Sequence, residues 1–323
     1  MTLVAASVMP LPKAAHPGRF ERLTPLLREL NDLKRVRAAH FKGSYADRLF
    51  VAAWRLLVNG APVRSVALQI TARALAATRL AGIDADTLAG HGLQPHEIEQ
   101  TLRFAIDDLG DAVPDALRDD LRNALTLPVC GDVTPLPAFV GQLVRQPRAG
   151  ATHPGKPRMI LEPAESHGDH CLTVAVYAVL VTPRFGGDIG TVFLTGLAHH
   201  LFNGSLPDAG FNGDVVLERA GVKACVVERA FALAYAQLDP VLARTVRNAL
   251  AFTKQTEPAN SRCFHAADVF DRVLEMAWFD RVAQFRLKNA VRDLDIVHVA
   301  PEQSFQRETL TEAGIWREWP DAR

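Results

Sequence analysis

The sequence predicts an all-α fold, and two features of its hydrophobic pattern carry that prediction. Apolar residues recur at three- and four-residue intervals along most of the chain, which is the spacing of a buried helix face. The alternation of apolar and polar residues that marks a half-buried strand is nearly absent. Hydrophobic residues make up 48% of the 323 residues, which is enough to form a sizeable core. We therefore expect a helical bundle preceded by a smaller helical region at the N-terminus.

In the first half of the chain, prolines and capping residues mark where helices begin. Leucines three and four positions apart predict a helix over residues 20–36, interrupted by Pro25. Ser44 and Asp47 have the spacing of a capping box, which predicts a helix that ends at Asn59-Gly60. Further helices are expected to begin near Pro62, Pro95, Pro114 and Pro137.

Beyond residue 158 several runs of apolar residues are each expected to form a helix. Asp239 and Pro240 form a capping residue followed by a first-turn proline, which marks one of these helix starts. The last thirty residues are consistent with either a short strand pair or a packed tail. The expected helices cover residues 170–182, 188–202, 222–238, 239–253 and 261–291.

The clearest boundary lies at residues 145–158, which are rich in Pro, Gly and basic residues and have no apolar period, as in an exposed linker. The predicted organisation has four parts. These are an N-terminal tail (1–18), an N-terminal helical domain of unassigned role (19–145), a second helical domain (159–295), which carries the candidate site described below, and a C-terminal tail that packs on it (296–323).

Charge and cysteine content exclude several classes of protein. Lys plus Arg and Asp plus Glu both number 36, so no field of one sign is available to attract nucleic acid. No uncharged stretch approaches the ~20 residues of a membrane span, and we expect neither a membrane nor a nucleic-acid partner. The four cysteines form no CxxC pair and are expected to be buried thiols of a cytoplasmic protein. They are Cys130, Cys171, Cys225 and Cys263.

Four polar residues stand in apolar helices of the second half. His170 opens one such helix, the pair His199-His200 closes the next, and Asp268 lies inside a later one. Burying these groups costs free energy unless each has a partner, and a shared divalent cation would satisfy them together. Imidazoles with a carboxylate suit Fe, Mn, Zn, Co or Ni, and such an ion can supply hydroxide near neutral pH.

Each of these residues also has a purely structural interpretation. A single buried histidine is more often hydrogen-bonded within a core than bound to a metal. Adjacent histidines on a helix point about 100° apart, so His199 and His200 need local help to face one point. Asp268 can form an ion pair with Arg272 one helical turn away.

The order of the four residues resembles the HD-domain superfamily of metal-dependent phosphohydrolases. Residues 170–178 look like the family's HSxxVAxxA run, residues 194–200 like its AGLLHD run, and residues 266–271 like its AADxxD run. The resemblance covers about residues 160–290. It implies a helical bundle in which His170, His199 and Asp268 bind metal for the hydrolysis of phosphate esters.

One position departs from the family pattern, because His200 stands where the doublet has an aspartate. A neutral imidazole can bind one ion but cannot bridge two, and it removes one negative charge from the site. Two interpretations follow. Either one divalent ion is bound by His170, His199, His200 and Asp268, or the metal site has been lost.

Three residues near the expected metal ligands are candidates for catalysis. His265, three positions before Asp268, is a candidate general acid or further ligand, with structural capping as the alternative. Lys254 and Arg272 are candidates for neutralising a phosphate, although Lys254 also fits an ordinary surface charge.

Other neighbours are expected to support the site or to lie outside it. His167 and Asp169 flank His170 and suit the orientation of an imidazole. Glu162 and Glu165 are expected to be solvated.

Three functions remain open. The leading one is a metal-dependent phosphohydrolase acting on a small phosphorylated or nucleotide-like substrate. The alternative is a catalytically degenerate HD-like scaffold, ligand sensor or partner-binding protein. A mixed-valence di-iron oxygenase of the same superfamily is the third, but it needs additional histidines between the doublet and Asp268, where only His265 is present.

Overall fold

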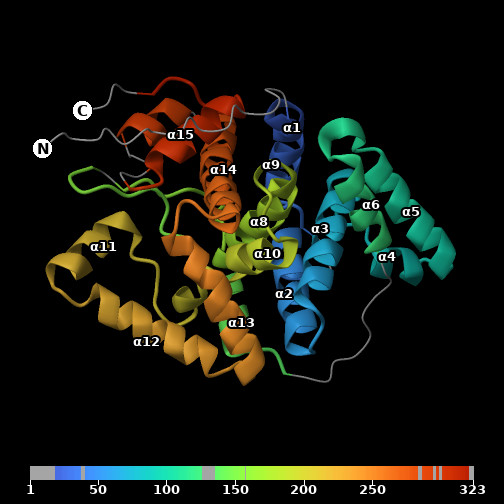
Figure 1. The fold of residues 1–323 in the computed structure, drawn as a ribbon, viewed down its shortest axis with the longest axis horizontal. Coiled ribbons are helices and arrows are strands. Elements are labelled where there is room, and N and C mark those ends of the chain that lie inside the picture. Colours follow the sequence, from blue (N-terminus) through green and yellow to red (C-terminus); the bar gives the residue numbers. More distant parts are fainter. Residues whose placement is uncertain are drawn as a thin grey trace, which may run out of the picture.

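The computed structural model is built of helices, as the hydrophobic pattern predicts (Figure 1). It describes residues 19–37, 41–125, 135–156, 158–282, 286–293, 296–297 and 300–319, so the predicted tail over residues 1–18 lies outside the described part. Extended pairing within these ranges is limited to two isolated bridges, Pro147 with Ser166 and Ala151 with Met159.

The helices of the first half are α1 (Arg19–Asp32), α2 (Tyr45–Val58), α3 (Val63–Leu80), α4 (Ala85–Gly90), α5 (Pro95–Asp107), η1 (Gly110–Ala112), α6 (Asp115–Asn123) and α7 (Ala138–Arg145). Those of the second half are α8 (His167–Leu180), α9 (Thr182–Phe185), α10 (Ile189–Ala198), η2 (Leu201–Gly204), α11 (Gly210–Arg219), α12 (Lys223–Tyr235), α13 (Pro240–Leu250), η3 (Ala251–Lys254), α14 (Ala259–Val282), η4 (Asn289–Asp293) and α15 (Gln303–Glu312).

Helix α1 continues through Pro25, where the sequence predicts an interruption. Its apolar face is buried on both sides of the proline, with Leu23 and Leu27 5% and 0% exposed. The hydroxyl of Thr24 donates to the carbonyls of Phe20 and Ala313, which ties this turn to the C-terminal segment. Packing therefore outweighs the backbone hydrogen bond that proline removes.

Two N-terminal caps, one from each half of the chain, are interlocked. Ser44 with Asp47 forms the predicted capping box of α2, and Ser166 with Asp169 forms an equivalent one at α8. The Ser166 hydroxyl donates to Asp47 at 2.5 Å, and the Ser44 hydroxyl donates in turn to Asp169. Each serine thus binds the other helix's aspartate. This exchange sets the start of α8, and with it the position of His170, relative to the N-terminal helices.

Helix α8 lies at the centre of the core, and every residue from His167 to Leu180 is buried. It packs against α10, α14 and α2 (Figure 1). The approach of α10 depends on Gly196, because a Cβ there would lie 2.6 Å from the Ala175 Cα. No side chain fits at that distance, so the glycine allows the two histidine-bearing helices to come together.

One cluster of buried apolar residues runs through both predicted domains, joining Trp54 and Ile70 of the first half to Phe193 and Phe270 of the second. The predicted linker also has a structural role. Residues 147–165 fold back on themselves through the two isolated bridges and line a cavity over α14.

The predicted C-terminal tail contains helix α15, which packs on α14. A short strand pair was one of the two expectations for this region, and the structure has a helix there instead. Among the described residues, no helix has the length and apolar character needed to cross a membrane. Cys171 and Cys263 are buried as predicted, but Cys225 is exposed, and Cys130 lies outside the described residues.

Candidate metal centre

Three histidines meet where helices of the core begin and end. His170 lies in the first turn of α8, directly after the capping residue Asp169, and His199 and His200 follow the last residue of α10. Regular helix stops at Ala198, so the two adjacent imidazoles are not held 100° apart around one helix axis. The ring centroids of His199 and His200 lie 4.9 and 5.1 Å from that of His170. The end of α10 therefore provides the local geometry that lets both rings face His170.

Each imidazole is held through Nδ1. The Nδ1 of His170 lies 2.6 Å from Oδ2 of Asp271, and the Nδ1 of His199 lies 2.7 Å from the Gly196 carbonyl. The Nδ1 of His200 lies 2.7 Å from Oδ1 of Asn203. Partners of this kind set the tautomer and direction of metal-binding histidines, and they leave Nε2 as the nitrogen that faces a ligand.

The Nε2 atoms of His170 and His199 are only 3.0 Å apart. Since a carbonyl can only accept a hydrogen bond, the His199 proton is on Nδ1 and its Nε2 presents a lone pair. If the His170 proton is likewise on Nδ1 and is donated to Asp271, the two Nε2 lone pairs face each other and need a cation or a proton between them; if it is on Nε2, it forms a hydrogen bond to His199. One ring nitrogen each from His170, His199 and His200 lies within 4.8 Å of the other two, and such a group can hold a metal ion.

Asp268 reaches the same point from α14. Its Oδ1 lies 3.5 Å from Nε2 of His170 and 3.9 Å from Nε2 of His199. Two ligands bound tetrahedrally at about 2.1 Å from one ion are about 3.4 Å apart, so these separations suit a shared ion. The other oxygen of Asp268 is 3.0 Å from Arg272. The predicted ion pair with Arg272 is therefore present, and Oδ1 of Asp268 lies within 4 Å of His170 and His199.

Burial sets the charge state of the imidazoles. It lowers the pKa of His199 to about 4 and lowers the pKa of His170 and of His200 well below the ordinary value. Burial tends to raise the pKa of Asp268, but Arg272 and His199 outweigh it and lower that pKa overall. At neutral pH the site therefore offers neutral imidazoles and an ionised carboxylate, which are the forms that bind metals.

A buried lysine stands behind His170. Lys34, which follows α1, has a side chain only 1% exposed, and its Nζ lies 2.6 Å from Glu165, 2.7 Å from Asp271 and 3.3 Å from Glu275. Burial opposes the charge on Lys34, but these three carboxylates raise its pKa overall. Burial in turn raises the pKa of Asp271 to about 8, against the opposing effect of Lys34.

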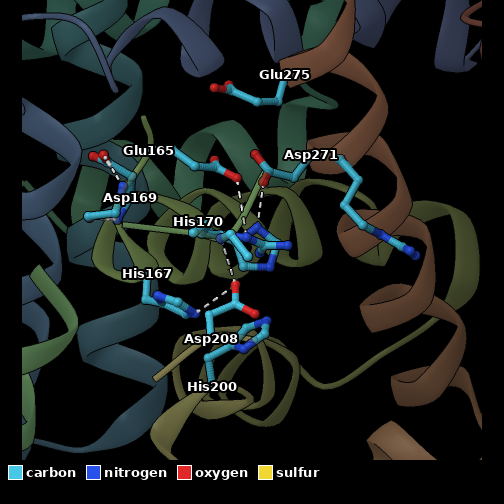
Figure 2. Close-up of polar contacts among 12 residues, drawn as sticks. Glu165, His167, Asp169, His170, His200, Asp208, Asp271 and Glu275 are labelled. Atoms are coloured by element: carbon cyan, nitrogen blue, oxygen red, sulfur yellow. Dashed lines mark hydrogen bonds and ion pairs between the residues drawn. The ribbon is translucent and has the colours of Figure 1, made fainter. Parts of the chain in front are cut away.

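This carboxylate cluster contains a second possible set of cation ligands. Donor atoms of Glu165, His170 and Asp271 also lie within 4.8 Å of one another. Figure 2 shows Glu165, Asp271 and Glu275 on one side of His170, with His200 and Asp208 on the other. The Lys34 ammonium already contacts Glu165 and Asp271. The protein's own cation therefore balances the charge of this second set of donors. Glu165 was expected in solvent, but its side chain is only 12% exposed because it binds Lys34.

A cavity of about 740 Å³ opens beside the centre. His199, His200 and Asp268 line it, so the proposed ligands are accessible from this side. Arg148 and Arg272 also line this cavity and bring positive charge to it. The cavity lies in the size range of sites that hold small organic ligands.

The structure separates the candidate catalytic residues. Arg272 lines the cavity, donates to the Ile296 carbonyl and pairs with Asp268. His265 is 5% exposed, and its Nε2 lies 2.8 Å from the Gln255 carbonyl. This contact agrees with the structural capping role that was the alternative to catalysis for His265. Lys254 is exposed and is not among the cavity-lining residues.

Two flanking residues support the centre indirectly. Asp169 caps α8 and binds Ser44. The Nδ1 of His167 lies 3.2 Å from the Gln146 carbonyl, while its Nε2 has no hydrogen-bond partner among the described residues and lies 3.7 Å from Asp208. Both therefore brace the start of α8 and are not among the grouped metal donors.

Two charged residues of the site have no local sequence signal. Lys34 and Arg148 lie in polar stretches of the chain. Arg148 belongs to the predicted linker, yet its charge is among the causes that lower the pKa of His170 and of His200, after burial. The effect of such a charge on the histidines becomes visible only when distant segments meet.

Comparisons with protein-family models, curated proteins and solved structures give no match for this chain.

Proposed function

We propose that this chain is a metal-dependent phosphohydrolase with one divalent transition-metal ion bound by His170, His199, His200 and Asp268. The observation that carries the proposal is the 3.0 Å approach of the His170 and His199 Nε2 atoms, with Asp268 beside them. Nitrogen-rich donors with a carboxylate suit Fe, Mn, Zn, Co or Ni. When bound, such an ion lowers the pKa of its water ligand and supplies hydroxide near neutral pH.

The protein's own residues would prepare the site for that chemistry. Asp271, Gly196 and Asn203 orient the three imidazoles through Nδ1. Arg272, on the cavity wall, is positioned to attract an anionic ester and also holds Asp268. The Arg148 guanidinium adds a second positive charge to the cavity lining.

Lys34 favours one metal ion over two. A second ion would have to displace a buried ammonium that contacts Glu165 and Asp271 directly. The neutral imidazole of His200 also cannot bridge two ions as the two oxygens of a carboxylate do. A di-iron oxygenase is therefore disfavoured, and a count of two irons per chain would contradict this part of the proposal.

Metal content is the first test. Protein purified without chelator, or reconstituted with each candidate metal, is expected to hold about one ion per chain by elemental analysis. It should then hydrolyse bis(4-nitrophenyl) phosphate or 4-nitrophenyl phosphate in a metal-dependent way. His199→Ala should abolish both binding and hydrolysis, whereas the exposed His91→Ala should change neither. Absence of bound metal and of hydrolysis with every metal would contradict the proposal and favour a non-catalytic scaffold or sensor.

The identity of residue 200 offers a sharper test. His200→Asp restores a charged oxygen ligand, so metal affinity, particularly for Mn, is expected to rise. Isothermal titration of the two proteins with the same metal measures the change. An unchanged affinity would place His200 outside the coordination sphere.

A further inference from the structure

The cavity beside the metal centre changes character along α14. Its lining residues on this helix are Asp268, Arg272, Glu275, Met276 and Phe279. Spacings of three and four residues place them on one helix face. With a rise of 1.5 Å per residue, Met276 lies about 12 Å and Phe279 about 16 Å further along the helix than Asp268.

The charge of Glu275 does not interrupt the apolar end of this face. Its carboxylate contacts Lys34 at 3.3 Å and is also bound by Arg35, so it is already neutralised by the protein. Beyond Arg272, the apolar part of the lining that α14 contributes is therefore mainly Met276, which is 8% exposed, because Phe279 is only 1% exposed.

The segment that precedes α8 also contributes to the cavity lining. Glu165 binds Lys34 behind the histidines, whereas Ile160 and Leu161 lie five and four residues earlier in the same segment and also line the cavity. Since five residues span at most about 17 Å, Ile160 lies no further than that from Glu165. Ile160 is 72% exposed, so its side chain is available for contact. Ile296 adds a further apolar side chain to the lining.

The size of the cavity exceeds what the metal-bound group alone requires. Cavities of 300–1,000 Å³ bury whole organic ligands, and this one measures about 740 Å³. A phosphate ester at the histidines would leave most of the apolar end empty. The ligand therefore needs a second part that matches hydrocarbon side chains.

We propose that the substrate is an amphiphilic ester, with its anionic group at the histidines and a hydrocarbon group against Ile160, Leu161 and Met276. The position of the anionic group rests on the proposed phosphohydrolase function. The position of the hydrocarbon group rests on the cavity walls alone, and the two can be tested separately.

The test uses n-alkylphosphonates from ethyl to octyl, titrated calorimetrically into the full chain with and without its metal. Transfer of a methylene from water to an apolar site is worth up to about fourfold in affinity. We expect a gain of about two- to fourfold per methylene, present in both forms of the protein. The metal should add a constant factor at every chain length.

Variants identify the wall that binds the chain. Ile160→Ser, Leu161→Ser and Met276→Ser should each weaken octylphosphonate by about three- to tenfold and leave ethylphosphonate unchanged. Leu233→Ser is the matched control, because Leu233 is 59% exposed on α12 and does not line the cavity. Circular dichroism checks that each variant is folded. Because Ile160 is exposed, Ile160→Ser should fold and still tests the apolar wall if Met276→Ser unfolds.

Each outcome bears on one proposal. An affinity that does not change with chain length overturns the amphiphilic substrate, whether or not metal binds. A chain-length dependence that all three wall variants retain also overturns it, because the chain then binds elsewhere. Absence of any metal contribution at every chain length contradicts the phosphohydrolase, while a chain-length dependence lost only in the wall variants supports the apolar site.

Discussion

Replacing Lys34 by methionine tests whether the buried ammonium holds the carboxylates behind His170. Methionine keeps much of the apolar stem but removes the charge. Glu165, Asp271 and Glu275 would remain buried together, with Arg35 beside Glu275 and Arg148 3.4 Å from Glu165 as the nearby cations. Removing one partner of a buried ion pair typically costs 3–5 kcal/mol, and we expect about that loss in the free energy of unfolding. Total stabilities are about 5–15 kcal/mol, so the variant should be folded but clearly weakened.

The same substitution should weaken metal binding without removing a ligand. Asp271 orients His170, and loss of such a partner typically lowers metal affinity about 10–100-fold. Urea unfolding at pH 8 and at pH 5 measures stability, and the loss should be smaller at pH 5, where protonation relieves the uncompensated carboxylates. Lys34→Arg is the control that keeps the charge.

A Lys34→Met variant with a loss below about 1 kcal/mol at both pH values, and with unchanged metal affinity, would refute this reasoning. It would mean that the three carboxylates are protonated or solvated without Lys34. In that case the lysine would not be the cation that serves the second set of donors.

Three further predictions concern the helices that position the histidines. Gly196→Ala places a Cβ 2.6 Å from the Ala175 backbone and should cost about 3 kcal/mol or more in urea unfolding, whereas Gly90→Ala, with nothing within 4 Å, should be nearly neutral. Ser166→Ala removes the α8 cap and the bond to Asp47, and it should cost about 1–2 kcal/mol; a double-mutant cycle with Ser44→Ala should show the two losses to be non-additive. Burial raises the pKa of Asp169 to about 7, above its unfolded value of 3.8, so its contribution to stability is present at acid pH and is lost as pH rises through 7. Asp169→Asn should therefore become more stable relative to the wild type between pH 5 and pH 8, and an equal difference at both pH values would contradict the assignment; Asp188→Asn, at an exposed cap, should show no such change.

Local patterns account for most of the fold. The capping box at Ser44, the start at Asp239-Pro240 and the apolar runs of α8 and α10 were predicted because helix periodicity and caps act within about four residues. The exceptions are decided by packing. Pro25 lies inside α1, and the predicted linker forms a cavity wall, because distant segments cover them.

Sequence order alone singled out His170, His199, His200 and Asp268 as residues of one site. It could not decide whether the adjacent histidines face one point, because that depends on where α10 ends. Only the tertiary structure supplies the partners of those side chains, including Lys34, which meets Asp271 from 237 residues away. Such contacts leave no local pattern, since the charges are buried only once the helices have packed, and only then does each one need the others as partners.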